Sequence, residues 1–165
     1  MNKIIIGIGI AVVVLGGLVW MAQPDSQGNS ITPPASGSGT LVAEEANNYD
    51  FGTISMAAGK VKHTFKIKNT GSEPSTIKKM YTSCMCTTAT LTNGGRQFGP
   101  YGMPGHGAIP IIDETVNPNG EAAVEVVFDP AAHGPAGVGR IQRSITIENS
   151  GGQPVELLFA AVVTP

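Results

Sequence analysis

The sequence predicts an all-β domain in which about seven short strands pack as a sandwich. Aromatic residues make up only 5% of the chain, while Gly (22) and Pro (12) are abundant, which favours short strands joined by many turns. Several stretches alternate apolar and polar residues with the period of two that indicates a half-buried strand. Turn residues separate them at spacings of roughly 8 to 12 residues, so the fold class is an immunoglobulin-like β-sandwich.

The expected strands follow one another from residue 41 to the end of the chain. In residues 61–69 Val61, His63, Phe65 and Ile67 alternate with Lys and Thr, so His63 is expected to be an inward-facing strand residue rather than a ligand. A strand over residues 75–81 is expected to continue through both cysteines to about Leu91. The other strands are predicted over residues 41–45, 49–54, 121–128, 140–148 and 154–163.

The segment before this domain has the features of a membrane anchor and a tether. Residues 4–22 are uncharged and apolar, long enough to cross a hydrocarbon layer of about 30 Å as a helix. Lys3 precedes them and no basic residue follows until Lys60, which predicts a cytoplasmic N-terminus and an extracytoplasmic domain. A cleaved signal peptide is the competing interpretation, but Trp20 stands where the cleavage site needs a small residue. We therefore predict an anchor over 1–22, a flexible Ser-, Gly- and Pro-rich linker over 23–40 and a folded domain over 41–165.

Charge and motifs exclude several classes of function. The net charge is −2 and the ten basic residues are spread along the chain, so nucleic acid is not an expected partner. The sequence contains no nucleophile elbow, phosphate loop, zinc-protease helix motif or dinucleotide fingerprint. We therefore expect a protein that is not an enzyme, anchored in a cytoplasmic membrane as a single-pass protein, with a binding or structural role toward another protein of the cell envelope.

Several segments together resemble a known family. They are residues 49–54 (YDFGTI), 63–71 (HTFKIKNTG), 82–89 (TSCMCTTA), 126–130 (VVFDP) and 145–147 (ITI). The set resembles a bacterial extracytoplasmic family of unknown function with an S-C-x-C-T-T motif, similar to Hydin-type immunoglobulin-like domains, over roughly residues 47 to 163. The resemblance implies the sandwich fold and attachment to the membrane or envelope, with no established reaction. Met85 replaces the glycine that the family usually has between the cysteines, and the segment that follows is longer than usual.

Cys84 and Cys86 are the two cysteines of the chain. In an extended strand they would point to the same face, where they could share a soft metal ion, form a disulfide or be buried side by side. Free cysteine is commonly buried, so burial of both side chains in the core is the simplest expectation. Catalytic disulfide exchange is disfavoured because the sequence indicates neither a helix N-terminus nor a cation beside the pair.

A copper site is the alternative function. Residues 92–119 show little strand pattern and are expected to form a long loop that carries Met103 and His106. Thiolate and thioether ligands select Cu(I), so Cys84 and Cys86 with Met85, Met103 or His106 would form a copper-handling site. His133 is expected on an exposed turn, and Met56 and Met80 are expected to fill gaps in the core.

Overall fold

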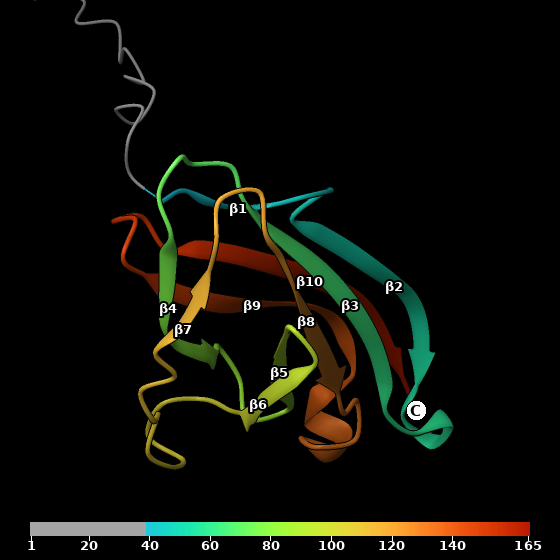
Figure 1. Ribbon diagram of the computed structural model, residues 1–165. Coiled ribbons are helices and arrows are strands. Elements are labelled where there is room, and N and C mark those ends of the chain that lie inside the picture. Colours follow the sequence, from blue (N-terminus) through green and yellow to red (C-terminus); the bar gives the residue numbers. More distant parts are fainter. Residues whose placement is uncertain (1–38) are drawn as a thin grey trace, which may run out of the picture. The chain divides into compact units, whose positions relative to one another are not determined.

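The computed structural model describes residues 39–165, which form two packed five-stranded sheets (Figure 1). The first sheet has the strand order β1-β3-β8-β5-β6 and the second has the order β2-β10-β9-β4-β7. The first contains β1 (Leu41–Ala43), β3 (Val61–Asn69), β5 (Thr87–Asn93), β6 (Arg96–Tyr101) and β8 (Glu121–Phe128). The second contains β2 (Asn48–Ser55), β4 (Ser75–Thr82), β7 (Glu114–Val116), β9 (Gly139–Asn149) and β10 (Val155–Thr164). The predicted all-β sandwich is confirmed, but residues 39–165 form ten strands rather than the predicted seven or so.

Two short 3-10 helices and an uncommon pairing complete the architecture. The helices are η1 (Met56–Ala58) and η2 (Gly134–Gly137). Strand β2 runs parallel to β10, with Asn48 beside Leu158, whereas the other paired strands run antiparallel. No helix within residues 39–165 is long and apolar enough to cross a membrane. The predicted span over residues 4–22 and most of the predicted linker lie outside the described residues.

The core forms where the inward faces of the two sheets meet. Every second side chain of a strand points into this core, as the alternating burial along β8 and β10 shows. Met80 is fully buried and Met56 packs against the core, as expected of gap-filling residues. The largest fully buried side chains are Phe159, Ile67, Ile77, Met80, Leu91, Ile145, Ile147 and Leu157.

Residues 92–119 are more ordered than predicted. The expected long loop contains β6 and β7, and β5 reaches Asn93. Gly94 and Gly95 have φ of 55° and 81°, the left-handed pair that a two-residue hairpin requires, so β5 turns directly into β6. The prediction of a single structureless loop is therefore wrong, and the longest stretch here without strand structure is residues 102–113.

Asn69, the last residue of β3, links the two sheets. Its side chain is fully buried and makes four hydrogen bonds to the backbone. Oδ1 accepts from the N–H groups of Thr40 (2.9 Å) and Gly71 (3.0 Å), and Nδ2 donates to the carbonyls of Glu73 (2.8 Å) and Val116 (2.9 Å). Because Val116 belongs to β7, the amide ties a strand of the first sheet to an edge strand of the second.

Candidate functional site

The cysteine segment is a turn between the sheets, not a continuous strand. Strand β4 of the second sheet ends at Thr82 and β5 of the first begins at Thr87. The Thr87 N–H donates to the Cys84 carbonyl at 3.1 Å, and the buried Thr82 hydroxyl lies 3.0 Å from the carbonyls of both Cys84 and Thr87. The predicted strand to Leu91 is wrong because the chain must cross between the sheets here, and these hydrogen bonds close a turn instead.

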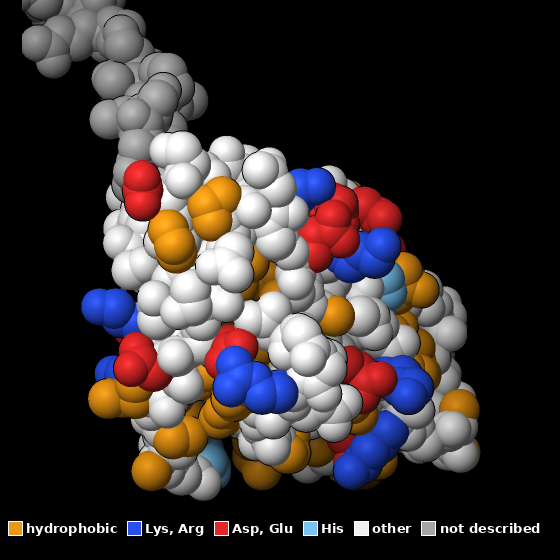
Figure 2. All heavy atoms as spheres, in the orientation of Figure 1, with side chains coloured by type: hydrophobic (Ala, Val, Ile, Leu, Met, Phe, Trp, Pro, Cys, Tyr) orange, Lys and Arg blue, Asp and Glu red, His pale blue; other side chains and the backbone are white. Residues whose placement is uncertain are grey.

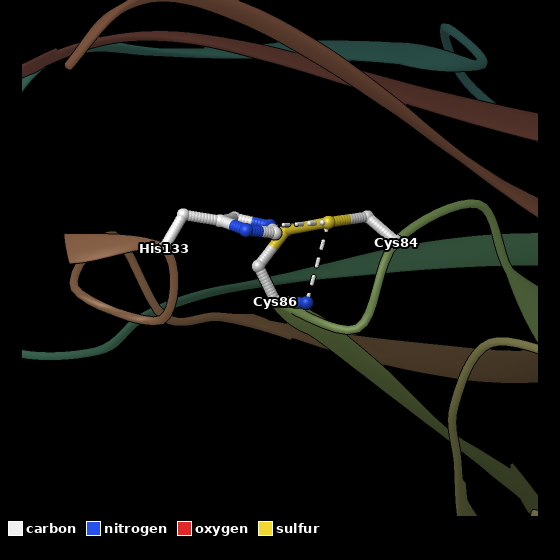
Figure 3. Close-up of side chains that lie close together, drawn as sticks. All are labelled: Cys84, Cys86 and His133. Carbon is white, nitrogen blue, oxygen red and sulfur yellow. Dashed lines mark hydrogen bonds between the residues drawn. A yellow bond between two sulfur atoms is a disulfide. The ribbon is translucent and has the colours of Figure 1, made fainter. Parts of the chain in front are cut away.

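A disulfide joins Cys84 and Cys86 across this turn, with 5.3 Å between the Cα atoms (Figure 3). Both residues belong to the buried core, with 7% of Cys84 and 3% of Cys86 exposed. Of the three arrangements that the sequence left open, the structure therefore has the disulfide. Met85 lies between them and is 52% exposed.

His133 approaches the disulfide from the loop after β8 (Figure 3). Its Nε2 lies 3.1 Å from Cys84 Sγ, and the Asp129 N–H donates to the Cys86 carbonyl at 2.9 Å, which fastens this loop to the turn. His133 is exposed, as the sequence predicted, but its contact with Cys84 was not predicted. The pairing of Thr87 with Phe128 explains the contact, since in an antiparallel pair the residues after Phe128 lie beside those before Thr87.

Arg143, which is positively charged, is a second neighbour of the pair. It lies in the middle of β9, where it interrupts the apolar side of the strand, and its Nε donates to Cys86 Sγ at 3.5 Å. Its Nη1 donates to the Gln142 carbonyl at 2.8 Å. The expectation that no cation lies near the cysteines is therefore wrong. The cation comes from another strand, so the sequence around the cysteines does not reveal it.

The remaining predicted ligands gather in a different place. Met85, Met103 and His106 line one hollow of about 720 Å³, together with residues of β6 and of the segment after it. Among the described residues, one group of three His, Cys, Asp or Glu side chains has its metal-binding donor atoms within 4.8 Å of one another. The group is Cys84, Cys86 and His133. His106 is thus outside the close group, and the metal role of the five predicted residues stays a prediction.

His63 belongs to a structural aromatic cluster. Its ring stacks on Tyr49 with centroids 3.6 Å apart and contacts Phe65 edge-on. Burial lowers the pKa of His63 from its ordinary value, and the charge of Glu45 opposes this shift. The prediction that His63 is an inward-facing strand residue is confirmed.

Part of the chain is similar to a family of unknown function. A family model described as "Protein of unknown function (DUF1573)" matches residues 42–99. That match includes the cysteine turn and agrees with the expected resemblance to a family without an assigned function. The likeness to Hydin-type domains stays a prediction, and no curated protein matches the chain.

Solved structures show the fold. A protein of unknown function from Porphyromonas gingivalis W83 superposes with a TM-score of 0.55 at 17% identity, covering 81% of this chain and 51% of that one. This chain thus spans about half the length of that protein. The PapD-like domain 7 of human CEP192 gives 0.45 at 14% identity (82% and 91% covered), and the CooA pilin subunit from enterotoxigenic Escherichia coli gives 0.42 at 16% (78% and 99% covered). At these identities the likeness concerns the sandwich fold alone.

Proposed function

We propose that this chain is a membrane-tethered immunoglobulin-like module that binds another protein on the extracytoplasmic side of a bacterial cytoplasmic membrane. The Cys84–Cys86 disulfide carries the proposal, because disulfides persist in oxidising compartments and are rare in the cytoplasm. The apolar residues 4–22 and the polar linker after them support a single-pass anchor with its N-terminus inside.

The sandwich offers surfaces suited to a protein partner. Strands β1, β6, β2 and β7 lie at sheet edges, and an extended segment of a partner can add to such an edge through backbone hydrogen bonds. Strand β2 is the longest edge strand and most of its residues are exposed. On the face shown in Figure 2 acidic and basic side chains are interspersed, a distribution that favours neither nucleic acid nor a strongly charged partner. Binding without catalysis is the role that these features support.

Protease accessibility and crosslinking test this proposal in bacterial cells. The full chain is expected in the membrane fraction, with its domain digested by protease added to spheroplasts. A variant with Ile8→Lys and Val13→Lys is expected to leave the membrane fraction, because charges in the apolar run oppose insertion. Crosslinking is expected to trap one envelope protein in preference to an unrelated sandwich carried on the same anchor. A domain protected from protease, or a crosslinking pattern equal to that control, contradicts the proposal.

A Cu(I) site is the second candidate function. The observation that favours it is the group of Cys84, Cys86 and His133, whose donor atoms lie within 4.8 Å of one another. Two thiolates and an imidazole suit Cu(I), and the disulfide must first be reduced to supply the thiolates. The structure thus favours His133 over His106 as the nitrogen ligand.

Anaerobic titration of the reduced full chain with Cu(I) distinguishes these ligand sets. Cys84→Ser/Cys86→Ser is expected to abolish tight binding and His133→Ala to weaken it, while His106→Ala serves as the matched histidine control. Equal binding by the double cysteine variant and the unmodified chain contradicts the copper site.

A further inference from the structure

Hydrogen-bonding groups surround both sulfur atoms of the disulfide, and two of them, the Cys86 N–H and Arg143 Nε, are donors. Cys84 Sγ accepts the Cys86 N–H at 3.3 Å and lies 3.1 Å from His133 Nε2. Cys86 Sγ accepts from Arg143 Nε at 3.5 Å and lies 3.6 Å from the Thr87 hydroxyl. A disulfide sulfur is uncharged and a weak acceptor, whereas a thiolate gains strongly from such donors and from a nearby cation. The surroundings therefore suit the reduced pair better than the oxidised one.

Arg143 strengthens this argument. It forms no ion pair with any carboxylate among residues 39–165, although its guanidinium is always charged and half-buried. Reduction would give this cation an anionic partner in Cys86. A reduced form that is stabilised by its neighbours makes a disulfide a stronger oxidant.

The size of the closed loop argues against a purely structural role. The entropy that a disulfide removes from the unfolded chain grows with the number of residues between its cysteines. Cys84 and Cys86 are two positions apart, so the loop is among the shortest that a disulfide can close. The turn already has its own hydrogen bonds from Thr87 and Thr82. A covalent link adds little stability to such a turn.

We infer that Cys84 and Cys86 form a thiol–disulfide exchange site that oxidises a dithiol on a partner protein. The inference rests on the proposed extracytoplasmic placement only for the compartment in which the partner lies. The exchange is stoichiometric, two electrons from one dithiol for each disulfide, and so fits a binding module. Met85 is an exposed and flexible apolar side chain at the tip of the turn, suited to contact with a partner segment.

The first step forms a mixed disulfide at Cys84. Cys84 is the more exposed of the two and lies beside His133. His133 accepts the proton of the partner's first thiol, and the resulting thiolate attacks Cys84 Sγ. The bond between Cys84 and Cys86 breaks, and its electron pair leaves on Cys86 Sγ beside the Arg143 guanidinium.

The second step releases the oxidised partner. Solvent removes the proton of the partner's second thiol, and this thiolate attacks the partner sulfur of the mixed disulfide. The bond to Cys84 breaks and its electron pair leaves on Cys84 Sγ, which takes the proton held by His133, while Cys86 stays a thiolate beside Arg143. The partner has lost two electrons and two protons and gained a disulfide. One of the protons is on Cys84 and the other is in solvent.

Redox equilibration of the full chain in detergent tests the inference. The protein is equilibrated with mixtures of reduced and oxidised dithiothreitol, the thiols are alkylated and counted by mass, and circular dichroism reports the fold. We expect reversible reduction of a folded protein. Arg143→Gln is expected to make reduction about tenfold less favourable, the usual size of one lost charge-assisted contact, and Arg143→Lys to recover part of this loss. Arg140→Gln, on an exposed residue of the same strand, is the control.

Kinetics separate the role of His133 from a structural one. His133→Ala is expected to slow reduction by dithiothreitol several-fold at pH 6.5 and much less at pH 9, where the attacking thiol ionises without help. A glutathione adduct trapped with acid is expected on Cys84 by tandem mass spectrometry.

Three results would overturn the exchange site. They are reduction that occurs only when the domain unfolds, Arg143→Gln and His133→Ala variants that match Arg140→Gln, and an adduct confined to Cys86. None of these results depends on membrane topology. The protease experiment described above tests the extracytoplasmic placement separately, so failure of the exchange site can be distinguished from failure of the proposed function.

Discussion

Replacing Asn69 with alanine should destabilise the domain more than any other single change to a polar side chain described above. The substitution removes four hydrogen bonds and leaves the buried carbonyl of Val116 without its partner in the protein interior. Each such bond contributes about 1 kcal/mol net, and the partly exposed groups regain water, so we expect a loss of about 3 kcal/mol. For a domain of this size the melting temperature should fall by roughly 10 °C.

Urea unfolding and calorimetry measure this loss, and two further variants refine it. Asn69→Asp keeps the oxygen acceptors but turns a buried carboxylate toward the carbonyls of Glu73 and Val116, so we expect at least the same loss. Asn149→Ala is the control, because Asn149 makes two comparable bonds, to Gln153 and Gly151, nearer the surface; we expect about 1 kcal/mol. If Asn69→Ala cost no more than Asn149→Ala, the bridging role of Asn69 would be refuted.

Three further predictions concern other regions. Burial lowers the pKa of His63, so the unfolded chain binds a proton at higher pH than the folded one. The stability of the domain should therefore fall as pH drops below about 6.5. Melting curves at pH 7.5 and 5.5 should show a smaller drop in melting temperature for His63→Gln than for the unmodified chain. Thr82→Val should cost about 1 kcal/mol in urea unfolding by removing the turn's hydroxyl, whereas Thr82→Ser should cost less. The Arg96 guanidinium donates to both oxygens of the buried Glu114 carboxylate, at 2.7 and 2.8 Å. Among residues 39–165, Arg96→Met leaves that carboxylate only the hydrogen bond from Asn93, so it should cost about 1 to 3 kcal/mol, and adding Glu114→Met should recover part of that loss.

Alternating strands could be predicted closely from the sequence. The expected strands over residues 61–69 and 121–128 match β3 (Val61–Asn69) and β8 (Glu121–Phe128) in both bounds. In each of them the buried face repeats every second residue, so a local pattern determines the strand. The β5–β6 hairpin also had a local signal, the Asn93-Gly94-Gly95-Arg96 turn, which the prediction of a long loop overlooked.

The site could be predicted only in part, because its members come from separate strands. The cysteines are visible in the sequence as a close pair. His133 reaches them through the pairing of β5 with β8, and Arg143 through the pairing of β4 with β9. Both contacts depend on which strands are neighbours in space, and the period of a single strand contains no such information. The crossing between sheets at Cys84 has the same origin.

The parallel pairing of β2 with β10 also determines when the domain can fold. Strand β10 lies between β2 and β9, so β2 has no neighbour in its sheet until β10 has been made. Contacts between such distant segments form late and slow the folding of all-β domains. Strand β10 must therefore emerge, from the ribosome or from a translocation channel, before the second sheet can close. Until then the backbone of β2 is unpaired, and it is open to pairing with another chain, in an aggregate, or to binding by a chaperone.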